Sequence, residues 1–303
     1  MSPKNIFGLL KEAFSEWQKD KASRLAAALA YYTVFSLAPV VIIAVAIAGS
    51  IFGAEAARGE IVGQIQGLVG EAGAEVIETA IENANQPDLK NVASFFSIIL
   101  LLFGASGVFA ELQDSLNTVW NVKAKPGRGI TNFVRKRILS FAMVLGIGFL
   151  LLVSLVISAA ISALSNYPQS LLTGFEFMGQ FINIIVSFGV ITLLFALIYK
   201  YLPDVKIKWS DVRIGAIITA LLFTLGKYII GLYLGRGSFA STYGAAGSVI
   251  IILAWVYYSA QILFFGAEFT QVYARKYGSQ IMPDRHSVSV TRPKSARQGI
   301  ERN

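Results

Sequence analysis

The sequence contains no cysteine and a single histidine, His286, among its 303 residues. The first absence excludes disulfides, thiolate metal sites and a cysteine nucleophile. Because His286 lies in a polar terminal segment, neither a zinc site nor a Ser-His-Asp triad is expected, and we predict no metal, no cofactor and no enzymatic activity. Charge is scarce too: 15% of residues are charged and 55% hydrophobic. An average soluble domain has about 25% charged residues, so this balance favours a protein surrounded by lipid.

Long uncharged stretches divide the chain into segments of membrane length. A hydrocarbon core of about 30 Å needs about 20 apolar residues in a helix, and backbone polar groups in lipid must be satisfied internally. The sequence therefore predicts an all-α polytopic bundle of about six transmembrane helices, forming a membrane domain over 25–275. The predicted spans are 26–52, 92–110, 138–164, 177–200, 214–235 and 248–274.

Basic residues are concentrated on one side of these spans. Of the 26 Lys and Arg residues, 22 fall in four connections on the same side: 1–24, 111–137, 200–213 and 275–303. The positive-inside rule assigns these segments, and hence both termini, to the cytoplasmic side of the bacterial inner membrane. Because topology accounts for the net charge of +8, membrane lipids are the expected partners and nucleic acid is not.

Three regions outside the spans have their own patterns. Residues 1–24 predict a cytoplasmic amphipathic helix on the inner membrane surface, since apolar side chains recur at helical spacing beside lysines: Ile6, Leu10, Phe14, Trp17, Lys4, Lys11 and Lys19. Residues 55–90 predict an acidic amphipathic helical insertion over the outer mouth of the bundle. Residues 276–303 predict a disordered basic cytoplasmic tail. The similar stretches 122–125 (VKAK) and 205–208 (VKIK) are interpreted as a coincidence of composition.

Two residues inside the predicted spans call for an explanation. Pro39 removes a backbone hydrogen bond within the first span, so it predicts either a packing kink or a hinge beside a substrate cavity. Lys227 lies within the fifth span, where a central Lys costs about 2.5–3.5 kcal/mol. It either extends its amine to the membrane surface or serves a buried pair or a transport pathway.

Glu268 is the intramembrane carboxylate of the sixth span. At about 1.5 Å per residue it lies about 10 Å deeper toward the cytoplasm than Lys227, too far for a direct pair. Gln261 is closer to the level of Lys227, and Arg24, at the start of the first span, is a predicted partner for Glu268. A structural ion pair and a proton or substrate site both remain open for Glu268.

The outer segment before the sixth span is rich in glycine and includes Tyr243, Gly244 and Gly247. No strand precedes it, so it is not a dinucleotide-binding fingerprint. Small residues here predict a tight turn or a close helix contact, with a short re-entrant stretch as the alternative.

With these residues in order, the sequence resembles the YihY/BrkB family of bacterial inner-membrane proteins, once labelled ribonuclease BN-like. The resemblance runs from about residue 20 to residue 275 and depends on 24–39 (RLAAALAYYTVFSLAP), Glu111, Leu116, Asn117, Trp120, Leu202, Pro203, Lys227, Tyr243, Gly244, 253–257 (LAWVY) and 266–268 (GAE). It implies a six-helix plasma-membrane protein with proposed roles in envelope integrity or in transport of lipids or other solutes. The ribonuclease label lacks the cluster of metal ligands that such chemistry needs.

Two classes of function follow. The first is a transporter or exporter of a lipid or another small solute, in which Lys227 attracts an anionic group and Glu268 gates or exchanges a proton; a cation/proton antiporter is a variant. The second is a non-transporting membrane scaffold that docks a partner on its acidic outer helices. The sequence is compatible with a homo-oligomer in either case. No ATP-binding signature is present, so transport would use a gradient or a partner.

Overall fold

The computed structural model describes residues 3–69, 71–84, 92–125, 175–236, 245–278, 281–285 and 287–290, with the single positions 138 and 146. Most of these residues are helical, which confirms the predicted helical class. The helices are α1 (Pro3–Lys19), α2 (Ala22–Phe52), α3 (Ala54–Val69), α4 (Glu71–Ala84), α5 (Val92–Val119), α7 (Phe175–Tyr201), α8 (Trp209–Arg236) and α10 (Ala245–Tyr277). The predicted span 138–164 lies outside the described residues except at 138 and 146.

Membrane-length helices occur where apolar stretches were found in the sequence. Within the described residues, four helical stretches are long and apolar enough to cross a membrane: Ala22–Ser50, Ile184–Tyr201, Trp209–Ile230 and Gly247–Tyr277. A fifth predicted span, 92–110, coincides with the first part of α5. The long apolar helices follow from the same composition that excludes a soluble surface.

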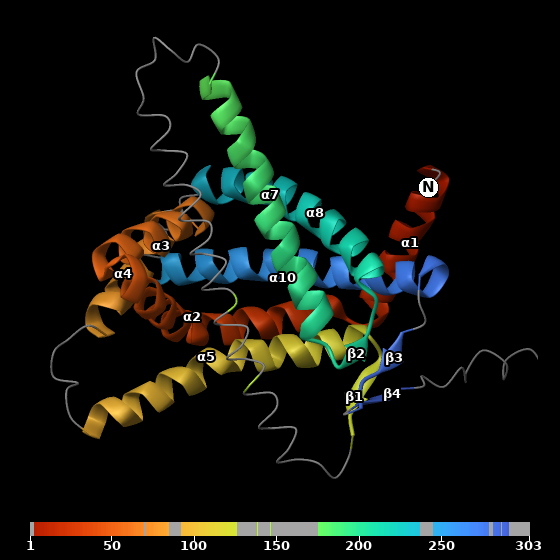
Figure 1. Ribbon diagram of the computed structural model, residues 1–303, viewed down its shortest axis with the longest axis horizontal. Helices are drawn as coiled ribbons and strands as arrows, with labels where there is room; N and C mark the ends of the chain where they lie inside the picture. Colours follow the sequence, from red (N-terminus) through yellow and green to blue (C-terminus); the bar gives the residue numbers. More distant parts are fainter. Residues whose placement is uncertain are drawn as a thin grey trace, which may run out of the picture.

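The bundle is organised around α10, which packs against α2 on one side and α8 on the other (Figure 1). Helix α5 packs along α2, and α7 packs on α8. We call one end of the bundle the strand end, where α5, α7 and α10 finish, α2 and α8 begin, and α1 lies. The other is the hairpin end, covered by the helical hairpin of α3 and α4.

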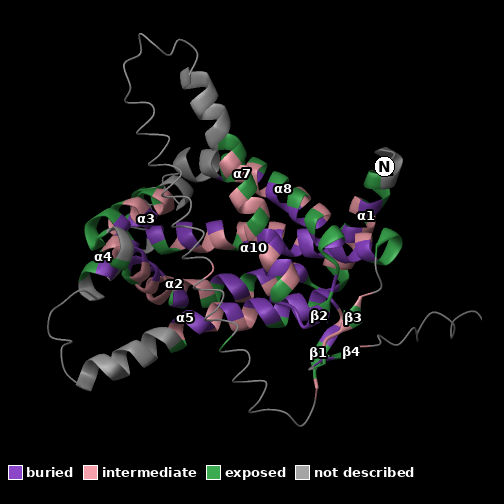
Figure 2. Ribbon diagram, viewed as in Figure 1, coloured by how far each residue is buried: buried purple, intermediate pink, exposed green. Residues whose placement is uncertain are grey.

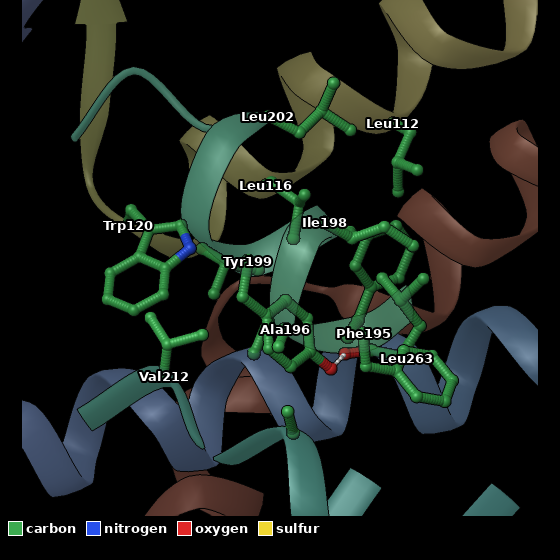
Figure 3. Close-up of a cluster of buried hydrophobic side chains, with 14 of the residues drawn as sticks. Leu112, Leu116, Trp120, Phe195, Ala196, Ile198, Tyr199, Leu202, Val212 and Leu263 are labelled. Atoms are coloured by element: carbon green, nitrogen blue, oxygen red, sulfur yellow. Dashed lines mark hydrogen bonds between the residues drawn. The ribbon is translucent and has the colours of Figure 1, made fainter. Parts of the chain in front are cut away.

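The main hydrophobic core occupies the half of the bundle nearest the strand end. Buried residues gather along the inward faces of the helices (Figure 2). Leu116 of α5, Tyr199 of α7, Val212 of α8 and Phe264 of α10 are all fully buried there. The Tyr199 hydroxyl donates to the Leu263 carbonyl oxygen at 2.7 Å, so its polar atom is satisfied inside this core (Figure 3).

The hairpin end has a smaller core of its own, in which Ile61 of α3 and Ile77 and Ile81 of α4 pack against Val41 and Ala48 of α2, among others. An ion pair network closes this hairpin. Arg58 of α3 donates to Glu78 at 2.8 Å and to Glu82 at 2.5 Å, both on α4. These hydrogen bonds to Glu82 and Glu78 raise the pKa of Arg58 above its usual value.

Part of the predicted disordered tail is ordered instead, because residues 282–283 and 287–289 form strands. β4 (Ser287–Ser289) pairs antiparallel with β1 (Val122–Ala124), and β3 (Met282–Pro283) pairs antiparallel with β2 (Val205–Lys206). The similar stretches 122–125 and 205–208 are therefore not a coincidence, since both supply an edge for this segment. In each, valine is buried and the next lysine is exposed, as strand alternation requires.

Candidate functional site

Helices α8 and α10 approach each other closely through small residues. A side chain placed on Gly215 of α8 would overlap Thr270 of α10, and one placed on Gly266 of α10 would overlap Thr219 of α8. Further along, Gly226 lies against Tyr258. Close contact through glycine is a common way to join two helices in lipid, where apolar burial offers little driving force.

These contacts also determine the register of the two helices. They match residue 215 with 270, 219 with 266 and 226 with 258, so each step along α8 corresponds to an equal step back along α10. Lys227 is therefore level with Tyr258. Glu268 follows Tyr258 by ten residues, or about 15 Å along the helix. A direct pair between Lys227 and Glu268 is excluded by this register, in agreement with the sequence argument from depth.

Polar groups gather at the level of Lys227. Lys227 is partly buried, and it forms no ion pair or hydrogen bond with the described part of the chain. Gln261 is three residues from Tyr258, within about 5 Å of the same level. Its Oε1 atom is buried and lacks a hydrogen-bond partner among the described residues, as does the Ser259 hydroxyl. We call Lys227, Ser259 and Gln261 the mid-helix polar level.

Glu268 belongs to a different region, near the strand end. Its side chain is fully buried. Because Gly266 and Thr270 face α8, Glu268 projects from the opposite side of α10, toward α2 and α5. Three residues later, Gln271 donates to the Val119 carbonyl oxygen of α5 at 2.9 Å.

Asp204 is the centre of a buried hydrogen-bond network at this end. Its Oδ1 atom accepts from Gln113 at 3.1 Å and its Oδ2 atom from Asn117 at 3.0 Å, both on α5. The Asp204 amide in turn donates to Asn117 Oδ1 at 2.8 Å. The Asp204 carbonyl oxygen accepts from the Ser287 hydroxyl at 2.6 Å and from the Asp284 amide at 2.9 Å. We call Gln113, Asn117, Asp204 and Ser287 the Asp204 network.

One member of this network, Asn117, also belongs to the family resemblance. The network links the end of α5, the connection between α7 and α8, and the C-terminal strands, which are far apart in sequence. Since both carboxylate oxygens accept hydrogen bonds, burying Asp204 is compensated, and the network positions the surrounding backbone. Within the described residues no group of His, Cys, Asp or Glu is arranged to hold a metal ion.

The remaining predicted site residues, Arg24, Pro39 and Gly247, are either exposed or packed against other parts of the bundle. Arg24 is exposed and forms no ion pair with the described residues, so the predicted pair with Glu268 is not formed. Helix α2 continues through Pro39, whose ring lies against Gly104 of α5. One turn earlier, Ser36 donates to the Gly104 carbonyl oxygen at 2.6 Å. Gly247 is buried in the first turn of α10; Tyr243 and Gly244 lie outside the described residues.

Sequence reasoning missed Asp204 and Gln113 as site residues. One signal was available for each. Asp204 directly follows Pro203, which is part of the family resemblance, and Gln113 is four residues before Asn117, on the same face of α5. The small residues Gly215 and Thr219 were also missed, although they are four apart within a membrane-length stretch, a spacing typical of close helix contacts.

The chain is similar to several membrane proteins of known sequence. A UPF0761 membrane protein of Psychrobacter sp. (strain PRwf-1) is 27% identical over 91% of the chain, which spans 50% of that relative. A UPF0761 membrane protein of Pseudoalteromonas translucida is 28% identical over 83% of the chain and 81% of its own length. One from Teredinibacter turnerae is 27% identical over 92% of the chain and 64% of its own length. No solved structure matches the chain.

A family model described as "Virulence factor BrkB" matches residues 13–291. The match includes α2, α5, α7, α8 and α10 together with the strands β1 to β4, so it covers both the mid-helix polar level and the Asp204 network. The chain is a membrane protein and belongs to the BrkB family.

Proposed function

We propose that the chain crosses the bacterial inner membrane six times, with the strand end and both termini in the cytoplasm. The distribution of Lys and Arg supports this orientation. Tyr201 and Trp209, at the strand end of α7 and α8, are 52% and 39% exposed and stack edge to face. Aromatic rings of this kind are enriched at membrane–water interfaces, which supports an interface at this level.

Within that topology, we propose that the protein transports an anionic lipid or another anionic small solute for the cell envelope. The observation that carries the proposal is Lys227, a partly buried cation in a membrane-length helix with no carboxylate partner among the described residues. Such residues are costly in lipid and usually mark a pathway or a partner. A phosphate or carboxylate group would supply the missing counter-charge.

The mid-helix polar level suggests how a polar group would be held. Lys227 attracts the anion, and the side chain of Gln261 offers a hydrogen bond at nearly the same depth. By helix register, Glu268 lies about 15 Å closer to the strand end than Lys227. A change in its protonation would therefore act on a different stage of transport from the binding of the anion at Lys227. In this proposal the protein is not an enzyme and binds no nucleic acid, and it draws energy from a gradient or a partner.

A second candidate function is a non-transporting scaffold, which the α3–α4 hairpin favours. Arg58 of α3 pairs with Glu78 and Glu82 of α4. Glu71 and Glu75, which also lie on α4, are exposed and are not paired with Arg58. This leaves acidic groups on the surface of the hairpin end, where a basic partner would dock. On this reading Lys227 contributes only to helix packing, and its replacement would lower the amount of folded protein without changing the activity per molecule.

Reconstitution separates the two functions. The full chain is placed in liposomes with fluorescent phosphatidylglycerol, or with fluorescent phosphatidylcholine as the neutral comparison, and transbilayer movement is followed together with potassium and proton fluxes. Lys227→Met removes the charge at similar length, and Lys227→Arg keeps it. Lys206→Met, which neutralises an exposed lysine on β2, is the matched control.

We expect wild type, Lys227→Arg and Lys206→Met to move phosphatidylglycerol, and Lys227→Met to lose at least tenfold in rate while remaining folded. Full activity in Lys227→Met would remove Lys227 from the pathway. Absence of flux of every probe in the folded wild type would favour the scaffold.

A further inference from the structure

Helix α1 packs across the strand end of the bundle. Leu9 and Ala13 are fully buried against Phe269 and Val272 of α10. In Figure 1, α1 crosses the end of α10 instead of running alongside it. Because α10 is of membrane length, a helix that crosses it near its end lies close to the plane of the membrane surface.

Both carboxylates of α1 are engaged at the last turn of α10. Arg275 donates to Glu12 at 2.5 Å and lies 3.8 Å from Glu16, and Lys276 also pairs with Glu12. Burial by itself raises the pKa of Glu12, but hydrogen bonds from Lys276 and Arg275 lower it below its ordinary value. Glu16 also accepts from Lys19 of α1 at 3.1 Å. The acidic side of α1 is thus paired with basic groups and faces the end of α10.

The opposite side of α1 is aromatic and exposed. Phe7 is 73% and Phe14 50% exposed, and Phe14 stacks on Trp17 with ring centroids 5.6 Å apart. At about 100° per residue, both phenylalanines lie between about 140° and 200° around the helix from Glu12 and Glu16. Lys11 is exposed next to this stripe. We call Phe7, Lys11 and Phe14 the outer face of α1.

The rotation of α1 therefore directs the outer face toward the hairpin end of the bundle. Its acidic side meets Arg275, at the end of α10, while its buried side packs against Phe269, six residues and about 9 Å deeper. A side chain opposite Glu12 consequently lies on the deeper side of α1. Exposed phenylalanines at that depth are in contact with lipid if the bundle spans the membrane.

We infer that the outer face of α1 docks on the lipid leaflet at the strand end and binds anionic headgroups. The occupant follows from charge, because Glu12 pairs with α10 and Glu16 pairs with Lys19 and Arg275, whereas the exposed Lys11 beside the aromatic stripe forms no ion pair with the described residues. Basic residues at an interfacial helix attract anionic lipids, and aromatic rings insert at the boundary of headgroup and acyl chain. The inference does not depend on transport and extends the sequence prediction by naming the face and the lipid.

The lack of cysteine makes a direct test practical, because one introduced cysteine carries one label. An environment-sensitive fluorophore is attached at Phe14→Cys or Phe7→Cys in the full chain, in nanodiscs of phosphatidylcholine with or without phosphatidylglycerol. Gly8→Cys is the matched control, because it is exposed, meets no heavy atom within 4 Å, and lies about 40° from Glu12. Spin-labelled lipids report contact with the bilayer by quenching.

We expect blue-shifted emission and strong quenching at positions 7 and 14, at least threefold more than at position 8. Removing phosphatidylglycerol, or adding Lys11→Glu, should reduce this quenching at least twofold. Equal, water-like emission at positions 7, 8 and 14 would overturn the inference. Quenching independent of lipid charge would overturn the headgroup assignment, and a blue shift without quenching by lipid would identify a protein partner instead.

Discussion

Replacing Asn117 by alanine should destabilise the strand end more than any neighbouring change on α5. Asn117 donates to Asp204 Oδ2 at 3.0 Å and accepts from the Asp204 amide at 2.8 Å, and both residues are buried. A hydrogen bond to a charged group contributes about 1.5–3 kcal/mol, and an orphaned buried amide costs about 1–3 kcal/mol. We therefore expect Asn117→Ala to lower the free energy of unfolding by about 3–5 kcal/mol.

The measurement is SDS titration of the purified protein in mixed micelles, followed by tryptophan fluorescence, because Trp120 is buried one turn away. Limited trypsin digestion at the exposed Arg285 reports whether the C-terminal strands detach first. Thr118→Ala is the matched control, since Thr118 is exposed and only donates to the Asp114 carbonyl oxygen one turn back. It should cost less than about 0.5 kcal/mol.

A double-mutant cycle separates this network from a general packing effect. If Asn117 acts through Asp204, then Asn117→Ala combined with Asp204→Ala should cost clearly less than the sum of the single changes. The reasoning would be refuted if Asn117→Ala were as stable as Thr118→Ala, or if the two single costs were additive.

Two further predictions concern the helix contacts. Gly215→Ala should destabilise the protein by about 2 kcal/mol in the same titration, because the added carbon overlaps Thr270. Adding Thr270→Ala should recover part of this loss. Gly59→Ala, whose added carbon meets open space, is the control, and equal stability of the two glycine variants would contradict the proposed close contact. For α1, the lowered pKa of Glu12 means that its ion pairs stabilise docking above the ordinary glutamate pKa of 4.5, and that this contribution is lost as pH falls through the lower folded value. Hydrogen exchange should therefore show α1 loosening below about pH 4.5 in wild type, whereas Glu12→Gln should be loose already at pH 7; identical protection in the two proteins at pH 7 would argue against these pairs.

Predictions based on local pattern were the most successful. Helices occupy the apolar stretches of α2, α7, α8 and α10 because hydrocarbon permits few other backbone conformations. The amphipathic pattern of residues 1–24 likewise corresponds to a helix, α1, with a buried and an exposed side. The prediction of disorder was wrong at 282–283 and 287–289, because strands of two or three residues leave too short a pattern to recognise and depend on partners elsewhere in the chain.

The candidate site depended on contacts that a single sequence does not reveal. The separation of Lys227 from Glu268 could be estimated from helix rise alone. The exposure of Arg24 could not, because it depends on which side of the first turn of α2 faces the neighbouring helices. Asp204 appeared in sequence only as one carboxylate in a connection. Its role became visible when Gln113, which is 91 residues earlier in the chain, was found at hydrogen-bond distance.

The sequence by itself determined that this protein lies in a membrane, that it is helical, and to which family it belongs. The first two follow because bilayer thickness and backbone hydrogen bonding constrain composition locally, over about 20 residues at a time. Only the tertiary structure decided the register of α8 against α10, the Asp204 network and the direction in which α1 presents Phe7 and Phe14. Each of these depends on pairs of residues far apart in the chain, such as Gln271 and Val119, 152 positions apart. Packing selects such pairs through shape and hydrogen-bond geometry, which a local pattern does not contain.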